Sequence, residues 1–204
     1  MPSFSWNVNI PQDTLDILTN FIRTRVSDAR SDGVVLGLSG GLDSAVTLSL
    51  AVSALGSEKV TGLIMPFRKT ESVELAKTHA DGLNVSTKII SIKKIVSSYK
   101  TSSSLFSDKL SEGNLHSRIR MSLLYGSGFS SNSLVIGTSN KSELLIGYWT
   151  KWGDGGTDFI PIGDLYKSQV ITLGEHLGVP SEILSRKPTA ELWPGQTDEE
   201  EFGF

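Results

Sequence analysis

The stretch that most constrains the fold is residues 33–55, GVVLGLSGGLDSAVTLSLAVSAL. It begins with a short apolar run bounded by glycine, which is typical of a strand that is buried on both faces. Small and polar residues at 39–44 interrupt this run, and an aliphatic helix is expected from Ala45 to Leu55, ended by Gly56. The stretch therefore predicts a buried strand, a glycine turn and a helix in direct succession.

This arrangement favours an anion site at the turn. Gly40 and Gly41 allow the backbone to approach a ligand closely, and the free N–H groups of the first helical turn point toward that ligand. Asp43 and Ser44 lie where a carboxylate or a hydroxyl holds a metal-bound phosphate. No lysine follows the glycines, so this is not the GxxxxGK[ST] loop. An ordinary strand-to-helix turn with an N-capping serine is the alternative, but S-G-G-x-D-S in this context favours nucleotide binding.

The rest of the chain predicts an α/β fold, doubly wound, with a mostly parallel sheet and helices on both faces. Further strands are expected at residues 60–65, 86–92 and 134–137, and helices at 13–30, 71–82, 112–125, 139–146 and 170–177. The serine-rich segment 97–107 is expected to be a mobile loop. No repeat or linker divides the chain, so residues 1–204 are expected to form one domain.

Composition excludes several classes of function. The chain has no cysteine, which excludes disulfides, cysteine-ligated zinc and a cysteine nucleophile. Its net charge of −3 argues against a nucleic-acid partner. The N-terminus has no signal-peptide pattern, and no apolar run is long enough to span a membrane. We therefore expect a cytoplasmic protein without a membrane or nucleic-acid partner.

The loop after the fourth expected strand carries a second polar set. Ligands of parallel sheets bind at the carboxyl ends of strands, so this loop and the glycine turn are expected to face one crevice. Thr138 can offer a hydroxyl to a nucleotide, and Glu143 can join Asp43 in holding Mg²⁺. The alternative for Glu143 is a solvated helix residue favoured by the helix dipole. Lys167, at the start of a helix, is better explained if it meets phosphate, although solvent exposure would also account for it.

Two further segments carry charged residues with open roles. Residues 150–158, TKWGDGGTD, combine carboxylates, a cation and an aromatic ring, but they lack the ligand spacing of a calcium loop. Arg118 and Arg120 flank Ile119, so at most one of them is expected to reach a given ligand. The three histidines share no spacing, and we interpret all of them as surface or packing residues.

These motifs resemble known enzymes. The segment 39–44 resembles the pyrophosphate-binding loop of the N-type ATP pyrophosphatases, a superfamily that activates carboxylates or carbonyls with ATP. Four segments, the first of which contains residues 39–44, narrow the resemblance to ammonia-dependent NAD synthetases: GLSGGLDSAV, GNLHSRIRM, GTSNKSELLIGYWTKWGDGGTDFIPIGDLYKSQV and KPTAELWPGQTDEE. This resemblance covers nearly the whole chain.

The resemblance implies a Rossmann-like fold of the adenine nucleotide alpha hydrolase type, and a homodimer. It implies that Asp43 and Lys167 are catalytic and that Asp43 and Glu143 bind Mg²⁺. It places deamido-NAD on Arg118, Lys151 and Asp158. It assigns ATP to a larger set: Gly37, Leu38, Ser39, Gly40, Gly41, Leu42, Asp43, Ser44, Thr138, Lys167 and Thr189.

The implied activity is the ATP-dependent amidation of deamido-NAD (nicotinic acid adenine dinucleotide) with ammonia. Its products are NAD, AMP and pyrophosphate, and the reaction passes through an adenylated intermediate. Family members continue for several tens of residues beyond the DEE segment, so this chain is expected to lack their C-terminal segment. Two alternatives remain open: another N-type ATP pyrophosphatase, such as a GMP synthetase-like or tRNA-modifying enzyme, and a non-catalytic nucleotide-binding module.

Overall fold

A four-stranded sheet, parallel throughout, forms the centre of the computed structural model, which describes residue 10 and residues 13–186. The strands are β1 (Gly33–Gly37), β2 (Val60–Ile64), β3 (Ser86–Ile89) and β4 (Ser133–Val135), and they lie in the order β3-β2-β1-β4. The chain adds β2 and β3 on one side of β1 and then crosses back to place β4 on the other side. The direction of winding therefore reverses between β1 and β4, the position where ligands of such sheets bind.

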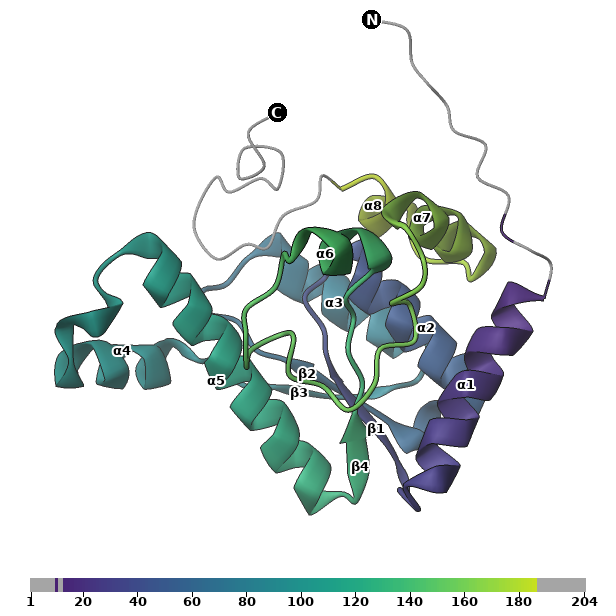
Figure 1. Cartoon of the computed structure of the whole chain (residues 1–204), viewed down its shortest axis with the longest axis horizontal. Coiled ribbons are helices and arrows are strands. Elements are labelled where there is room, and N and C mark those ends of the chain that lie inside the picture. The colour runs from purple at the N-terminus through teal and green to yellow at the C-terminus, as the bar shows by residue number, and fades with distance from the viewer. Residues whose placement is uncertain (1–9, 11–12, 187–204) are drawn as a thin grey trace, which may run out of the picture.

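Helices cover both faces of this sheet (Figure 1). They are α1 (Thr14–Asp28), α2 (Leu42–Leu55), α3 (Glu71–Gly82), α4 (Lys93–Ser102), α5 (Lys109–Ser130), α6 (Lys141–Ile146), α7 (Lys167–His176) and α8 (Ser181–Leu184), with 3₁₀ turns η1 (Ser57–Lys59) and η2 (Ser104–Phe106). The predicted α/β fold with a parallel sheet and helices on both faces is confirmed.

Successive residues of β1 enter two separate hydrophobic cores. Val34 and Leu36 pack into a core shared with α1, α2, α3, α7 and α8. Val35, which points to the opposite face, packs into a second core with residues of α4 and α5. Figure 1 shows α4 and α5 on one side of the sheet and α1 and α2 on the other. The apolar run of β1 is thus explained, because both of its faces are buried.

The prediction of a mobile loop at 97–107 is wrong, because most of that segment belongs to α4 and η2. Ile92 and Val96 are buried one helical turn apart, and Tyr99 packs edge-on against Phe106, so a narrow apolar stripe holds the helix. Ser98, Thr101 and Ser102 donate their hydroxyl groups to carbonyls four residues earlier, which keeps these polar side chains within the helix.

Other boundaries differ from the expectations by a few residues. Helix α5 begins before the predicted residue 112, because the Asp108 side chain caps its start by accepting from Ser111 N–H at 2.9 Å, and it continues beyond residue 125 to Ser130. Strand β4 ends at Val135, since Ile136 instead bridges Phe159. The third strand ends at Ile89, and α6 begins at Lys141.

The three histidines take packing or surface positions. His79 is buried between α2 and α3, where its Nε2 lies 3.2 Å from both Ser49 Oγ and the Ala45 carbonyl. His116 is buried against the ring of Phe67, whereas His176 is exposed. Within residues 13–186, no helix combines the length and the apolar character needed to cross a membrane.

Candidate nucleotide site

The glycine turn follows β1 at the reversal point of the sheet. Gly40 has φ +82°, in the left-handed region, and a Cβ added there would lie 2.2 Å from the Ser72 carbonyl oxygen. Only glycine fits this position without strain. The first turn of α3 therefore packs directly on the turn after β1 and fixes its path.

Serine hydroxyls brace the same turn from within. Ser39 Oγ accepts from the Gly41 N–H at 3.1 Å and lies 3.1 Å from Ser44 Oγ. Ser44 Oγ in turn donates to the Gly41 carbonyl at 2.9 Å, and it accepts from the Ser39 N–H at 3.3 Å. These bonds hold the turn in one conformation at the start of α2, so its backbone is organised before any ligand arrives.

The turn after β4 is built around a capping box. Asn140 Oδ1 accepts from the Glu143 N–H, and Glu143 Oε2 accepts from the Asn140 N–H, both at 3.1 Å. The other end of the Asn140 amide reaches across the reversal point, where Nδ2 donates to Asp43 Oδ1 at 3.3 Å. Asn140 thus contacts both of the carboxylates that the sequence proposed as metal ligands.

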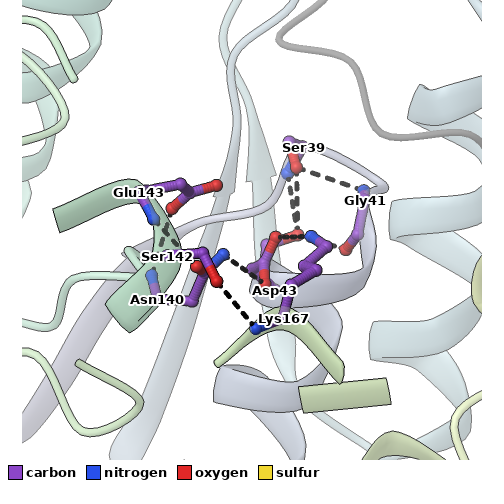
Figure 2. Close-up of polar contacts among 8 residues, drawn as sticks. Ser39, Gly41, Asp43, Asn140, Ser142, Glu143 and Lys167 are labelled. Atoms are coloured by element: carbon purple, nitrogen blue, oxygen red, sulfur yellow. Dashed lines mark hydrogen bonds and ion pairs between the residues drawn. The ribbon is translucent and has the colours of Figure 1, made fainter. Parts of the chain in front are cut away.

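Lys167 supplies a cation at the same place. Its ammonium group forms an ion pair with Asp43 Oδ2, and its backbone N–H donates to Ser142 Oγ at 3.1 Å. Figure 2 shows Asp43 between Asn140 on one side and Lys167 on the other, with Glu143 beyond Asn140. Residues from the first turns of α2, α6 and α7 therefore meet at one point, although they are far apart in the chain.

The donor set fits Mg²⁺ that arrives with a nucleotide. Among the residues that the structure describes, no three His, Cys, Asp or Glu side chains gather into a group that could hold a metal alone. Asp43 and Glu143 offer two carboxylates, and Mg²⁺ in nucleotide sites is held by one or two carboxylates together with phosphates and water. These residues therefore suit a metal shared with phosphate rather than a closed protein cage.

A cavity of about 220 Å³ joins both turns to the sheet. Ser39 and Thr138 contribute polar groups to its lining, and Met65, Leu124 and Ile136 contribute apolar ones. Arg120 also lines it, with its guanidinium Nε donating to the Met65 carbonyl at 3.0 Å. A nucleotide would match this mixed lining, because its flat nucleobase is largely apolar and its ribose and phosphates are polar.

Comparison with known proteins identifies the family. The model of the NAD synthase family matches residues 14–204. The chain belongs to the NAD synthase family. Two of its curated relatives are named NH(3)-dependent NAD(+) synthetase. The protein from Archaeoglobus fulgidus is 52% identical over 196 residues, which are 95% of this chain and 79% of that protein. The protein from Thermococcus kodakarensis is 47% identical over 190 residues, which are 93% of this chain and 75% of that protein.

Solved structures share the fold of this NAD synthase family member. An NMN synthetase from Francisella tularensis superposes with a TM-score of 0.90 at 38% identity, covering 96% of this chain and 82% of that chain. An NH3-dependent NAD synthetase from Campylobacter jejuni superposes with a TM-score of 0.82 at 42% identity, covering 85% of this chain and 76% of that chain. A glutamine-dependent NAD+ synthetase from Acinetobacter baumannii, solved with ADP, superposes with a TM-score of 0.80 at 33% identity. The match covers 92% of this chain and 38% of that chain.

Not all of the residues that the resemblance to NAD synthetases implies come together at this candidate site. Gly37, Leu38, Ser39 and Thr138 line the cavity. Asp43 and Glu143 both contact Asn140, and Lys167 pairs with Asp43. Gly40, Gly41, Leu42 and Ser44 complete the turn and the start of α2. Thr189 lies outside the described residues.

The residues expected to bind deamido-NAD are not part of the cavity lining, although Gly153, Asp154, Gly156 and Thr157, which lie between Lys151 and Asp158, are. Arg118 Nε donates to the Lys151 carbonyl at 3.1 Å, and the Lys151 ammonium lies 5.7 Å from the centre of the Trp152 ring. Asp158 is exposed, but its carboxylate accepts from the Val135 N–H at 2.7 Å and from the Tyr125 hydroxyl at 3.0 Å. Arg118 and Lys151 are thus neighbours, whereas Asp158 is anchored to the edge of the sheet.

The Tyr125 hydroxyl is held in its neutral form. Partial burial, together with the bond to Asp158, raises the pKa of Tyr125 to about 12. The hydroxyl therefore remains a donor to that carboxylate over the whole physiological range. Tyr125 fixes the orientation of Asp158 without titrating itself.

Sequence reasoning did not find what holds the segment 150–158. Asp154 Oδ1 accepts from Ser117 Oγ at 2.5 Å and from the Thr150 N–H at 3.0 Å, and Thr150 Oγ1 donates to Asn114 Oδ1 at 2.7 Å. Gly153 is buried against α5, where a Cβ would lie 2.5 Å from Ser117 Oγ. These contacts fasten the segment to α5 beside the cavity, and the pattern D-G-G alone did not reveal its partner helix.

Proposed function

We propose that this chain catalyses the ATP-dependent amidation of deamido-NAD with ammonia, giving NAD, AMP and pyrophosphate. The observation that carries the proposal lies at the reversal point of the sheet, where Asn140 contacts both Asp43 and Glu143 and where Lys167 pairs with Asp43. Two carboxylates and a lysine beside a glycine turn suit a metal-bound polyphosphate. The curated relatives named NH(3)-dependent NAD(+) synthetase support the same reaction.

The first step needs charge neutralisation more than it needs a protein nucleophile. The nicotinate carboxylate attacks the α-phosphorus of ATP, the bond to the β-phosphate oxygen breaks, and pyrophosphate leaves. In the proposed reaction Lys167 and the backbone N–H groups of the turn at 39–44 would neutralise that leaving group, which the position of Lys167 beside this turn supports. In the second step ammonia attacks the activated carbonyl carbon, loses a proton, and AMP leaves.

Asp43 and Glu143 would hold Mg²⁺ in this account. When bound, Mg²⁺ supplies Lewis-acid stabilisation of the negative charge on the phosphates. Lys167 is paired with Asp43 in the structure, so the arrival of the nucleotide offers its ammonium group a new anionic partner. Asp43, released from Lys167, would then be free to act as a ligand of Mg²⁺.

We place the acceptor, deamido-NAD, on the side of Arg118, Lys151 and Asp158, as the family resemblance implies. Arg118 holds the backbone of Lys151, and Tyr125 holds the carboxylate of Asp158, so the Lys151 main chain and the Asp158 charge are in defined positions. A homodimer is part of the proposal. The exposure of Leu110, Tyr125 and Phe129 on α5, with Phe129 93% exposed, supports it. A cytoplasmic location remains a prediction from the sequence.

A second candidate is the amidation of the corresponding mononucleotide. It is favoured by one observation, the TM-score of 0.90 to an NMN synthetase from Francisella tularensis. The chemistry of the nicotinate carboxylate would be unchanged, because only the adenylate half of the acceptor is missing. The two candidates differ in how the acceptor is bound and share the ATP site.

Product analysis separates the two candidates. Purified protein is incubated with ATP, Mg²⁺ and ammonium chloride, and with either deamido-NAD or nicotinic acid mononucleotide. Chromatography with mass detection quantifies the amide product, AMP and pyrophosphate. The proposal predicts a higher kcat/KM with deamido-NAD and equimolar AMP and pyrophosphate. A higher value with the mononucleotide would favour the second candidate, and ATP consumption without either amide would contradict both.

A further inference from the structure

Asn140 is the residue that connects the two candidate metal ligands. It is 1% exposed, and its side chain makes one bond toward each carboxylate-bearing element. We infer that Asn140 is a positioning residue that holds Asp43 and Glu143 in the geometry that Mg²⁺ requires. This inference rests on the proposed function, since it concerns the metal of that same site.

The hydrogen bonds determine which way the amide points. Its Oδ1 accepts from the Glu143 N–H at 3.1 Å, so the amide oxygen must face α6. Its Nδ2 then faces α2 and donates to Asp43 Oδ1 at 3.3 Å. A donor and an acceptor are needed at opposite ends of one short side chain, and asparagine supplies both without adding charge.

The backbone of Asn140 also holds the carboxylate of Glu143. The Asn140 N–H donates to Glu143 Oε2 at 3.1 Å, which draws this carboxylate back over the start of α6. Both carboxylates are therefore oriented by Asn140, one by the side chain and one by the main chain (Figure 2). Outer partners of this kind tune metal affinity by orienting the ligands that the metal contacts directly.

A purely structural role is the rival explanation. As the N-cap of α6, Asn140 would matter only for the stability of a six-residue helix. The two roles use different atoms, since capping needs only Oδ1 and positioning of Asp43 needs Nδ2. A substitution that keeps the first and removes the second can therefore distinguish them.

Asn140→Ser is that substitution. A serine hydroxyl is a good N-cap acceptor for Glu143 N–H, but it is too short to donate to Asp43. Asn140→Ala removes both bonds. Asp108→Ala is the matched control, because Asp108 caps α5 through Ser111 N–H at 2.9 Å and has no place in the proposed site.

Metal binding is measured directly with Mn²⁺ by electron paramagnetic resonance, in the presence of α,β-methylene-ATP, which cannot be cleaved at the α-phosphate. Thermal unfolding of the same samples without metal reports on the capping role. We expect Asn140→Ser to weaken Mn²⁺ binding about 10-fold while its unfolding temperature stays near that of the wild type. Asn140→Ala should weaken binding equally and also unfold at lower temperature, whereas Asp108→Ala should change only the unfolding temperature.

Two results would overturn the inference, and they are distinguishable. If the wild type binds Mn²⁺ with the analogue and Asn140→Ser binds it equally well, Asn140 is only a cap and the proposed function stands. If the wild type itself binds no Mn²⁺ with the analogue, the metal assignment of the proposed function fails together with this inference.

Discussion

Lys167, the first residue of α7, forms an ion pair with Asp43, in the first turn of α2, although 124 residues separate them in the chain. The pair is partly exposed, with 29% of the lysine side chain and 18% of the aspartate side chain accessible. Solvent-accessible pairs of this kind add little to stability. The contact places a cation and a carboxylate beside the glycine turn, where the proposed function requires groups that bind phosphate and its metal.

Asp43→Asn should abolish most pyrophosphate release while the fold persists. The change keeps the shape of the side chain but removes the charge that binds Mg²⁺, a loss of several kcal/mol in transition-state stabilisation and so roughly 100- to 1,000-fold in rate. Asp81→Asn is the matched control, because Asp81 also pairs with a lysine, Lys77, at 2.6 Å on the surface. Release at the wild-type rate by Asp43→Asn at limiting Mg²⁺ would refute the metal assignment.

Gly40→Ala should weaken ATP binding and lower the free energy of unfolding by about 1–3 kcal/mol. Alanine would have to adopt φ +82°, and its Cβ would meet the Ser72 carbonyl at 2.2 Å, so the turn or α3 must shift. Calorimetric titration with ATP and urea unfolding measure the two effects. Gly82→Ala is the control, since a Cβ there has no heavy atom within 4 Å. Normal ATP affinity in Gly40→Ala would show that the turn does not bind the nucleotide.

Lys151→Ala should raise the KM for deamido-NAD about 10-fold and leave the affinity for ATP unchanged, because we place this exposed cation on the acceptor side and charge-assisted bonds contribute about 1.5–3 kcal/mol at most. Lys77→Ala, another exposed lysine, is the control. Asp158→Ala is a less specific test, because it also leaves the Val135 N–H without its side-chain acceptor. A loss of ATP affinity in Lys151→Ala would mean that the two halves of the site are assigned the wrong way round.

The free energy of unfolding should fall as the pH drops from about 6.5 toward 4, and His116 should account for part of this. Burial, and secondarily the charge of Arg120, lowers the pKa of His116 to about 4. An unfolded histidine has a pKa near 6.5, so between these values only the unfolded state takes up the proton, and folding is progressively penalised.

His116→Phe tests this prediction, because it keeps a ring against Phe67 and removes the titration. Urea unfolding at pH 7 and pH 5 should show a smaller pH-dependent loss in the variant than in the wild type. Burial also lowers the pKa of His79, but that residue is present in both proteins and its effect cancels in the comparison. Identical losses in the two proteins would contradict the assignment.

Local patterns were sufficient to predict β1, the glycine turn and α2. The apolar run at 34–36, the two glycines and the aliphatic helix are neighbours in sequence, so their physics is local. The alternation of strands and helices then predicted the parallel sheet, and the family match confirms the predicted family. Helix α4 was missed because its apolar stripe is narrow and its other positions are mostly serine, threonine and lysine.

The contacts within the site depended on information that is not local. The bond from Asn140 to Asp43 spans 97 residues and requires β1 and β4 to be adjacent. The N-x-x-E pattern at 140–143 would have revealed the capping box, but not the reach of Nδ2 toward α2. Arg120 lines the cavity, whereas Arg118 is exposed. Which of the two arginines faces the cavity depends on how α5 is rotated about its axis against the sheet.

In the proposed reaction this protein joins ammonia to deamido-NAD at the expense of ATP. Releasing ammonia from glutamine requires an activated nucleophile, usually a thiol, and this chain has no cysteine. The most direct measurement quantifies NAD by mass spectrometry in reactions with deamido-NAD, ATP and Mg²⁺, supplied with either ammonium chloride or ammonia-free glutamine. The account predicts NAD with ammonium only, at a rate that rises with pH because neutral NH₃ is the nucleophile. Equal NAD formation from glutamine, or none from ammonium while ATP still binds, would contradict it.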